Sequence, residues 1–177
     1  GGLWGRMDLL EGMRSITSGG STVDTSHYDS LTWSKPPARF EGGLGNYAGI
    51  LGTSAAIDYI SNIDLDAVHE HEVSLNRIMT SILKDVNGLR IIGPEDAAQR
   101  GGICSILLDN IDAHDIAILL DEAASVMVRS GMHCVHSWFN AKGIDRGSLR
   151  ASAYLYNTED EVKVFAETLV EAVEALG

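Results

Sequence analysis

Residues 103–124 read ICSILLDNIDAHDIAILLDEAA, and this stretch decides the fold. Its first six residues, Ile103 to Leu108, form a short apolar run with the length of a buried strand. The second half has the pattern of a helix, because Asp112 is a favourable N-cap and apolar residues follow it at helical spacing. A buried strand that is followed at once by an amphipathic helix predicts a domain in which helices pack on a sheet.

The same reasoning, carried outward, predicts the remaining elements. Strands are expected over residues 89–92, 125–128 and 149–155, and helices over 47–60, 64–86 and 158–176. Thr158 and Glu161 form a capping box at the start of the last helix. After the helix over 64–86 the order is strand, strand, helix, strand, strand, helix. This order predicts an α/β (α+β two-layer) fold, with a small, mostly antiparallel sheet and helices on one face.

Residues 1–46 differ from the rest of the chain. They are rich in Gly, Ser and Thr, contain Pro36 and Pro37, and show helical periodicity only near Met7 to Met13. A loop of this length is uncommon inside a self-contained domain. We expect it to serve another surface, as an active-site wall or a partner-binding arm, and to be partly mobile.

Size and charge limit the classes of function. The chain has 177 residues, enough for one compact domain, and a formal net charge of -12 with no cluster of Lys and Arg, which argues against nucleic-acid binding. No apolar stretch approaches the about 20 residues of a membrane helix, and the N-terminus lacks a secretory pattern. We therefore expect a cytoplasmic protein with no nucleic-acid or membrane partner.

The stretch Arg129-Ser130-Gly131-Met132-His133-Cys134-Val135-His136 has the composition of a reactive-cysteine loop, which we expect to lie between two strands. Positive charge beside a cysteine stabilises the thiolate, and Arg129, His133 and His136 are potential cations next to Cys134. From spacing alone, Cys134 is equally well explained as an ordinary loop residue. Adjacent residues rarely converge on one ion, so no metal site is predicted.

The other cysteine, Cys104, lies inside the apolar run that opens the chain's central stretch. We expect it to be buried and inert. Two cysteines in a domain with a core do not make a disulfide framework, so we expect free thiols with separate roles.

Several segments, in order along nearly the whole chain, resemble the cysteine desulfurases of the class V aminotransferase superfamily, in particular their sulfur-mobilisation group. The segments are GLWGR at 2–6, LLE at 9–11, SGG at 18–20, TWSKPPARFEGG at 32–43, AAIDYI at 55–60, HDIA at 114–117, LD at 120–121, VRSGMHC at 128–134 and RASAYLYNT at 150–158.

The resemblance implies a fold and a division of the chain. The fold is that of a fold-type I pyridoxal-phosphate-dependent transferase. Residues 1–60 correspond to the closing segment of its large domain and residues 61–177 to its C-terminal small domain. The irregular start of the chain is then large-domain and dimer-interface material of a homodimer.

The resemblance also implies a chemistry. Pyridoxal phosphate would take up L-cysteine, Cys134 would receive the sulfur as a persulfide, and alanine would leave. Arg150 would hold the substrate carboxylate, and Gly43 and Leu44 would contact the cofactor phosphate of the partner subunit. The persulfide would pass to a sulfur-acceptor protein, for iron-sulfur clusters or other thio-cofactors.

The sequence departs from the family in ways that limit these expectations. No lysine stands in the context of the family's cofactor lysine, which precedes the matched stretch, so we expect the chain to be inactive without an N-terminal pyridoxal-phosphate-binding half or large domain. Leu44 replaces a hydroxyl residue, and Met132 replaces a histidine. A truncated chain, one half of a split enzyme and a degenerate homologue all fit this pattern.

Two other functions remain open at this point. One is a different class V aminotransferase-like enzyme, in which Cys134 would be incidental. The other is a non-catalytic binding or scaffold domain with the same fold.

Overall fold

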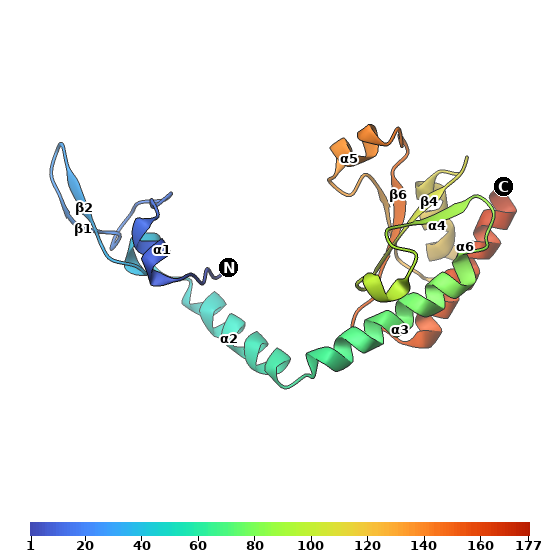
Figure 1. The fold of residues 1–177 in the computed structure, drawn as a ribbon, viewed down its shortest axis with the longest axis horizontal. Helices are drawn as coiled ribbons and strands as arrows, with labels where there is room; N and C mark the ends of the chain where they lie inside the picture. The colour runs from blue at the N-terminus through green and yellow to red at the C-terminus, as the bar shows by residue number, and fades with distance from the viewer. The chain divides into compact units, whose positions relative to one another are not determined.

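The computed structural model describes all 177 residues, and the chain divides into two compact units, Gly1–Asn62 and Ile63–Gly177 (Figure 1). Each unit is described by itself. None of the helices combines the length and the apolar character that crossing a bilayer would require.

The first unit consists of short elements and one longer helix. They are α1 (Met7–Gly12), β1 (Val23–Ser26), β2 (Leu31–Trp33), the 3-10 helix η1 (Ala38–Phe40) and α2 (Tyr47–Ser61). The predicted helix over 47–60 is confirmed as α2. The antiparallel pair of β1 and β2 was not predicted, because neither strand has a sustained alternation of apolar and polar residues.

Very little of the first unit is buried. No residue of α2 is buried. Even its large apolar side chains are exposed: Ile50, Leu51 and Ile57 are 59%, 72% and 58% exposed. Arg39 provides much of the internal bonding, since its Nε donates to Ser34 O at 3.0 Å and its Nη1 to Glu11 O at 2.9 Å. A two-stranded ribbon without a core is marginally stable in water, so this unit needs another surface to cover its apolar side chains.

The second unit is a four-stranded sheet with helices. Its strands are β3 (Leu89–Ile92), β4 (Ile103–Leu108), β5 (Arg129–Gly131) and β6 (Ser148–Ser152), in the order β3-β4-β6-β5 with all pairs antiparallel. Its helices are α3 (Leu65–Leu83), η2 (Ala97–Gln99), α4 (Ala113–Ala124), α5 (His136–Ala141) and α6 (Glu159–Leu176). The small antiparallel sheet with helices confirms the predicted fold class.

The core lies between one face of the sheet and the helices α3, α4 and α6, which pack on one another (Figure 1). Along β4, Cys104 and Ile106 are fully buried against these helices, and Ser105 points to the opposite face. The helices contribute fully or almost fully buried residues, among them Leu75, Met79, Leu83, Ile116, Leu120 and Leu169.

The predicted helix starts are confirmed by their caps. Asp112 accepts from His114 N at 2.8 Å, and Asp64 accepts from Asp66 N at 3.0 Å. Each cap satisfies a backbone N–H that has no partner within the helix.

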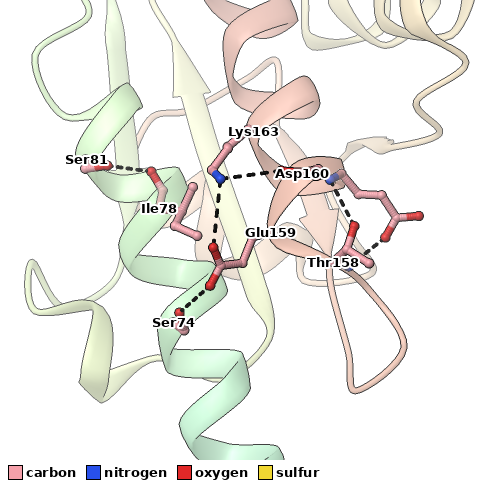
Figure 2. A network of polar contacts seen from close by, with 8 residues as sticks. Ser74, Ile78, Ser81, Thr158, Glu159, Asp160 and Lys163 are labelled. Carbon is pink, nitrogen blue, oxygen red and sulfur yellow. Dashed lines mark hydrogen bonds and ion pairs between the residues drawn. The ribbon is translucent and has the colours of Figure 1, made fainter.

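The start of α6 is bonded both to itself and to α3 (Figure 2). Thr158 Oγ1 accepts from Glu161 N at 3.2 Å, and the Glu161 carboxylate accepts from Thr158 N at 2.7 Å, which completes the predicted capping box. Glu159 accepts from Ser74 of α3 at 3.5 Å and pairs with Lys163 at 3.8 Å.

Two predictions around β5 are wrong. Residues 125–128 are not a strand, because Ser125 caps α4 in the left-handed conformation (φ 54°) and donates from its N–H to Asp121 O at 2.9 Å. The strand in this region is β5, which starts at Arg129. Residues 129–136 were predicted to be a loop, but the first three of them form β5 and the last, His136, begins α5. Alternation could not locate a strand of only three residues.

Candidate functional site

The sheet face opposite the three packed helices carries two arginines side by side. Ser105 of β4 pairs with Arg150 of β6, and Arg150 pairs in turn with Arg129 of β5. Directly paired residues of antiparallel strands point to the same face, so the side chains of Arg129 and Arg150 leave the sheet next to each other. Neither has an ion-pair partner within the chain. Two like charges in this arrangement repel each other and favour a bound anion.

Cys134 lies on a tight turn after β5. Gly131, His133 and Cys134 have φ of 110°, 49° and 64°, and Val135 N donates to Met132 O at 2.9 Å. Left-handed conformations cost non-glycine residues roughly 1–2 kcal/mol each. Two in succession are retained only where the surrounding structure requires them, and such positions cluster at functional sites. The turn leaves the Cys134 side chain exposed.

The guanidinium of Arg129 contacts the thiol. Its Nη2 lies 3.7 Å from Cys134 Sγ, the single side-chain hydrogen bond that Cys134 makes within the chain. A guanidinium at this distance can donate a hydrogen bond to a sulfur nucleophile. The structure therefore brings together Arg129 and Cys134, as the composition of the loop predicted.

The His133 ring contacts β6, and it makes no contact with the Cys134 sulfur. Its Nε2 lies 3.0 Å from both the carbonyl oxygen and Oγ of Ser148, a buried residue of β6. Burial lowers the pKa of His133, with smaller contributions from the charges of Arg150 and Arg129. The lowered pKa disfavours the charged ring, and a role of His133 as a cation beside Cys134 stays a prediction. The ring ties the cysteine turn to β6.

A hollow of about 330 Å³ lies on the same sheet face, next to the cysteine turn. Its lining residues are Ile92, Ile103, Ser105, His133, Val135, Trp138, Phe139, Ser148 and Arg150. Arg150 is half-buried, and its Nε is buried without a hydrogen-bond partner. An apolar hollow with one unpartnered guanidinium suits a small molecule that carries a carboxylate.

Sequence reasoning missed several residues that line this hollow. Ser105 was assigned only to an apolar strand, and Phe139 belongs to α5, a short helix that was not predicted. Alternation along β4 is the signal that would have found Ser105, because its neighbours Cys104 and Ile106 are the buried ones.

The residues predicted to contact the cofactor phosphate belong to the first unit. Gly43 has φ 82°, and its N–H donates to Gly20 O at 2.9 Å, so this amide is already used. Leu44 is 93% exposed and has no hydroxyl group. These two residues offer no side-chain donor, and only the backbone N–H of Leu44 is left to face a phosphate, so their contact with pyridoxal phosphate stays a prediction.

The second cysteine, Cys104, lies in the core. Cys104 is fully buried, as predicted, and burial raises its pKa to about 11, so it stays a thiol. No group of three or more His, Cys, Asp and Glu side chains is placed to hold a metal ion.

Comparison with known proteins decides the family. The family model described as Aminotransferase class-V matches residues 1–165. The chain belongs to this family. Among the class V relatives, a probable cysteine desulfurase of Xylella fastidiosa (strain Temecula1) is 34% identical over 177 residues, which is 100% of this chain and 42% of the relative. A probable cysteine desulfurase of Streptomyces coelicolor is 38% identical over 169 residues, 96% of this chain and 40% of the relative.

Solved structures of class V proteins agree with these matches. The apo cysteine desulfurase of Thermococcus onnurineus superimposes with a TM-score of 0.86 at 31% identity, over 96% of this chain and 42% of that one. A cysteine desulfurase of Escherichia coli, in an S-sulfonic acid form, superimposes with a TM-score of 0.84 at 27% identity, over 97% of this chain and 42% of that one. These matches confirm the resemblance to cysteine desulfurases and the fold-type I fold, and the chain spans about two fifths of the length of these relatives.

Proposed function

We propose that this chain is the C-terminal part of a cysteine desulfurase, in which Cys134 takes the sulfur of L-cysteine as a persulfide and L-alanine is released. The observation that carries the proposal is the exposed Cys134 on its left-handed turn, with the Arg129 guanidinium 3.7 Å from the sulfur. The names of the relatives support the same activity.

The proposed sulfur transfer balances without an oxidant. The Cys134 thiolate attacks the sulfur of L-cysteine, a new S–S bond forms, and the Cβ–S bond of the substrate breaks. Its electrons remain on the substrate carbon, which takes up a proton and leaves as part of alanine. Arg129 stabilises the attacking thiolate, and His133 holds the turn to β6 through Ser148.

Arg150 binds the substrate carboxylate in this proposal. Its unpartnered Nε faces no acceptor within the chain, and it stands beside Arg129 with no carboxylate to balance either charge. A carboxylate would relieve the repulsion between the two arginines and accept two parallel hydrogen bonds from a guanidinium.

Pyridoxal phosphate is the cofactor of the complete enzyme in this proposal. A lysine outside this chain would hold it, and Gly43 and Leu44 would contact the phosphate of the partner subunit's cofactor. When bound, pyridoxal phosphate supplies the electron withdrawal that weakens the Cβ–S bond of the substrate. We assign residues 1–60 to the large domain and 61–177 to the small domain of a homodimer. The exposed apolar residues of α2 support the first assignment, because a larger domain would cover them.

The test uses the chain with L-cysteine and pyridoxal phosphate, with and without the lysine-bearing part of the enzyme, and measures alanine release and the intact mass. We expect one added sulfur on Cys134 only when that part is present. Cys134→Ser should abolish both signals, and Cys104→Ala, the matched control at the other cysteine, should keep them. Alanine release that survives Cys134→Ser would instead support a different class V activity.

If the correctly assembled complex gives no reaction at all, the chain is a scaffold domain. If it reacts, the physiological role that we propose is sulfur delivery in the cytoplasm to an acceptor protein, for iron-sulfur clusters or other thio-cofactors.

A further inference from the structure

A second and larger hollow, of about 760 Å³, borders the edge strand β3. All four residues of β3 line it, together with Thr80, Leu83, Lys84, Gly93, Pro94, Glu95, Arg100, Leu107, Trp138, Lys142 and Ile144. Its volume is within the range of small-molecule sites. It shares Ile92 and Trp138 with the smaller hollow beside the cysteine turn, but none of the residues that the proposed sulfur transfer uses.

The charge of this hollow is opposite to that of the chain. The chain has 13 Lys and Arg against 25 Asp and Glu. The hollow is lined by four cations, Lys84, Arg90, Arg100 and Lys142, and by one acid, Glu95. Lys84 also has Asp85 at 3.9 Å, but both side chains are exposed, and such a pair contributes little. The excess of cations makes the hollow a local attractor for anions.

Arg100 is the most buried of these cations. It is only 7% exposed, and it has no carboxylate partner. Its Nη2 donates to Thr80 Oγ1, and its charge and hydrogen bonding act on the buried Cys104 thiol, whose pKa they lower against the larger effect of burial. No oxygen or nitrogen accepts from its buried Nε and Nη1. A buried charge is normally paired and fully hydrogen-bonded, because an unpaired one is costly to remove from water. The chain therefore presents a buried cation whose counter-ion it does not supply.

We propose that the hollow beside β3 binds the oxyanion group, phosphate or carboxylate, of a small molecule, with Arg100, Arg90 and Lys142 as the cations that line it. Arg100 provides a buried cation without a carboxylate partner, and Arg90 and Lys142 are exposed and free to adjust to an anion. The site is separate from the proposed sulfur-transfer site and does not depend on that activity.

Trp138 offers a direct signal of binding. It lines the hollow and is 41% exposed, whereas the other two tryptophans, Trp4 and Trp33, lie in the first unit. Inorganic phosphate and, in a second arm, citrate would be titrated into the 177-residue chain at constant ionic strength, with chloride as compensating salt. We expect a saturable change in fluorescence that Trp138→Phe removes. Saturation by phosphate identifies a phosphate site, and saturation by citrate alone identifies a carboxylate site.

Matched variants distinguish this site from general charge effects. Arg90→Gln and Lys142→Gln should each weaken binding about tenfold, the effect of losing one charge-assisted hydrogen bond. Lys163→Gln removes an exposed cation on α6, outside the hollow, and should leave the affinity unchanged. A response to phosphate and citrate no larger than the response to chloride, or an undiminished response in the folded Arg90→Gln/Lys142→Gln variant, would overturn the proposal.

Discussion

The guanidinium of Arg129 lies 3.7 Å from the sulfur of Cys134, although the two residues are five positions apart and a left-handed turn lies between them. This contact links the strand β5 to the only exposed thiol of the chain. It makes Arg129 the residue through which the reactivity of Cys134 can be changed without touching the cysteine.

Arg129→Gln should slow the alkylation of Cys134 by iodoacetamide at neutral pH about two- to fivefold, the effect expected of one exposed charge contact. Arg129→Lys should retain most of the rate. The rates are measured by mass spectrometry on the folded chain, where the buried Cys104 does not compete. Lys163→Gln is the control, because Lys163 lies on α6 and pairs with Glu159 and Asp160. An unchanged rate in Arg129→Gln would remove the proposed role of this arginine.

Arg150→Ala should raise the KM for L-cysteine by about 10- to 100-fold in the enzyme assembled from this chain and the lysine-bearing part, since charge-assisted hydrogen bonds to the carboxylate are lost. Arg150→Lys should recover only part of this loss, because an ammonium group cannot form two parallel bonds. Steady-state kinetics measure both values. A fall in kcat with KM unchanged would contradict a binding role.

The stability of the second unit should decrease as the pH falls from about 7 to about 5. The pKa of His133 is lowered in the folded chain by burial and by Arg150 and Arg129. Below the unfolded pKa of 6.5, the unfolded chain takes up a proton that the folded chain resists. The stabilisation is therefore present above that pH and is lost as the pH falls through the folded value. Urea titrations at each pH should show a shallower dependence for His133→Gln, and an equal slope would rule out His133 as its source.

Thr158→Ala should destabilise the second unit by about 1 kcal/mol, because it removes the oxygen that accepts from Glu161 N at the start of α6 (Figure 2). Thr158→Ser keeps this oxygen and should stay within a few tenths of a kcal/mol of the parent. Thermal unfolding followed by circular dichroism compares the two. Equal losses in both variants would show that the methyl group, and not the cap, is responsible.

The sequence predicted those elements whose signals are local. Asp64, Asp112 and Thr158 mark helix starts, and each cap is found where it was expected, because a cap depends on the next two or three residues alone. The apolar run from Ile103 to Leu108 was recognised as a strand for the same reason. The three-residue β5 and the left-handed cap at Ser125 were missed, since three residues are too few to show a period and the cap position holds a serine instead of a glycine.

The sequence by itself determined the helix starts, the central strand and the reactive-cysteine composition of residues 129–136. Only the tertiary structure decided that Arg129 stands opposite Arg150, that the His133 ring bonds to Ser148, and that Arg100 is buried without a carboxylate partner. The physical reason is that these relationships depend on strand register and on burial. Arg129 and Arg150 are 21 positions apart and His133 and Ser148 are 15 positions apart, and no local propensity acts over such separations.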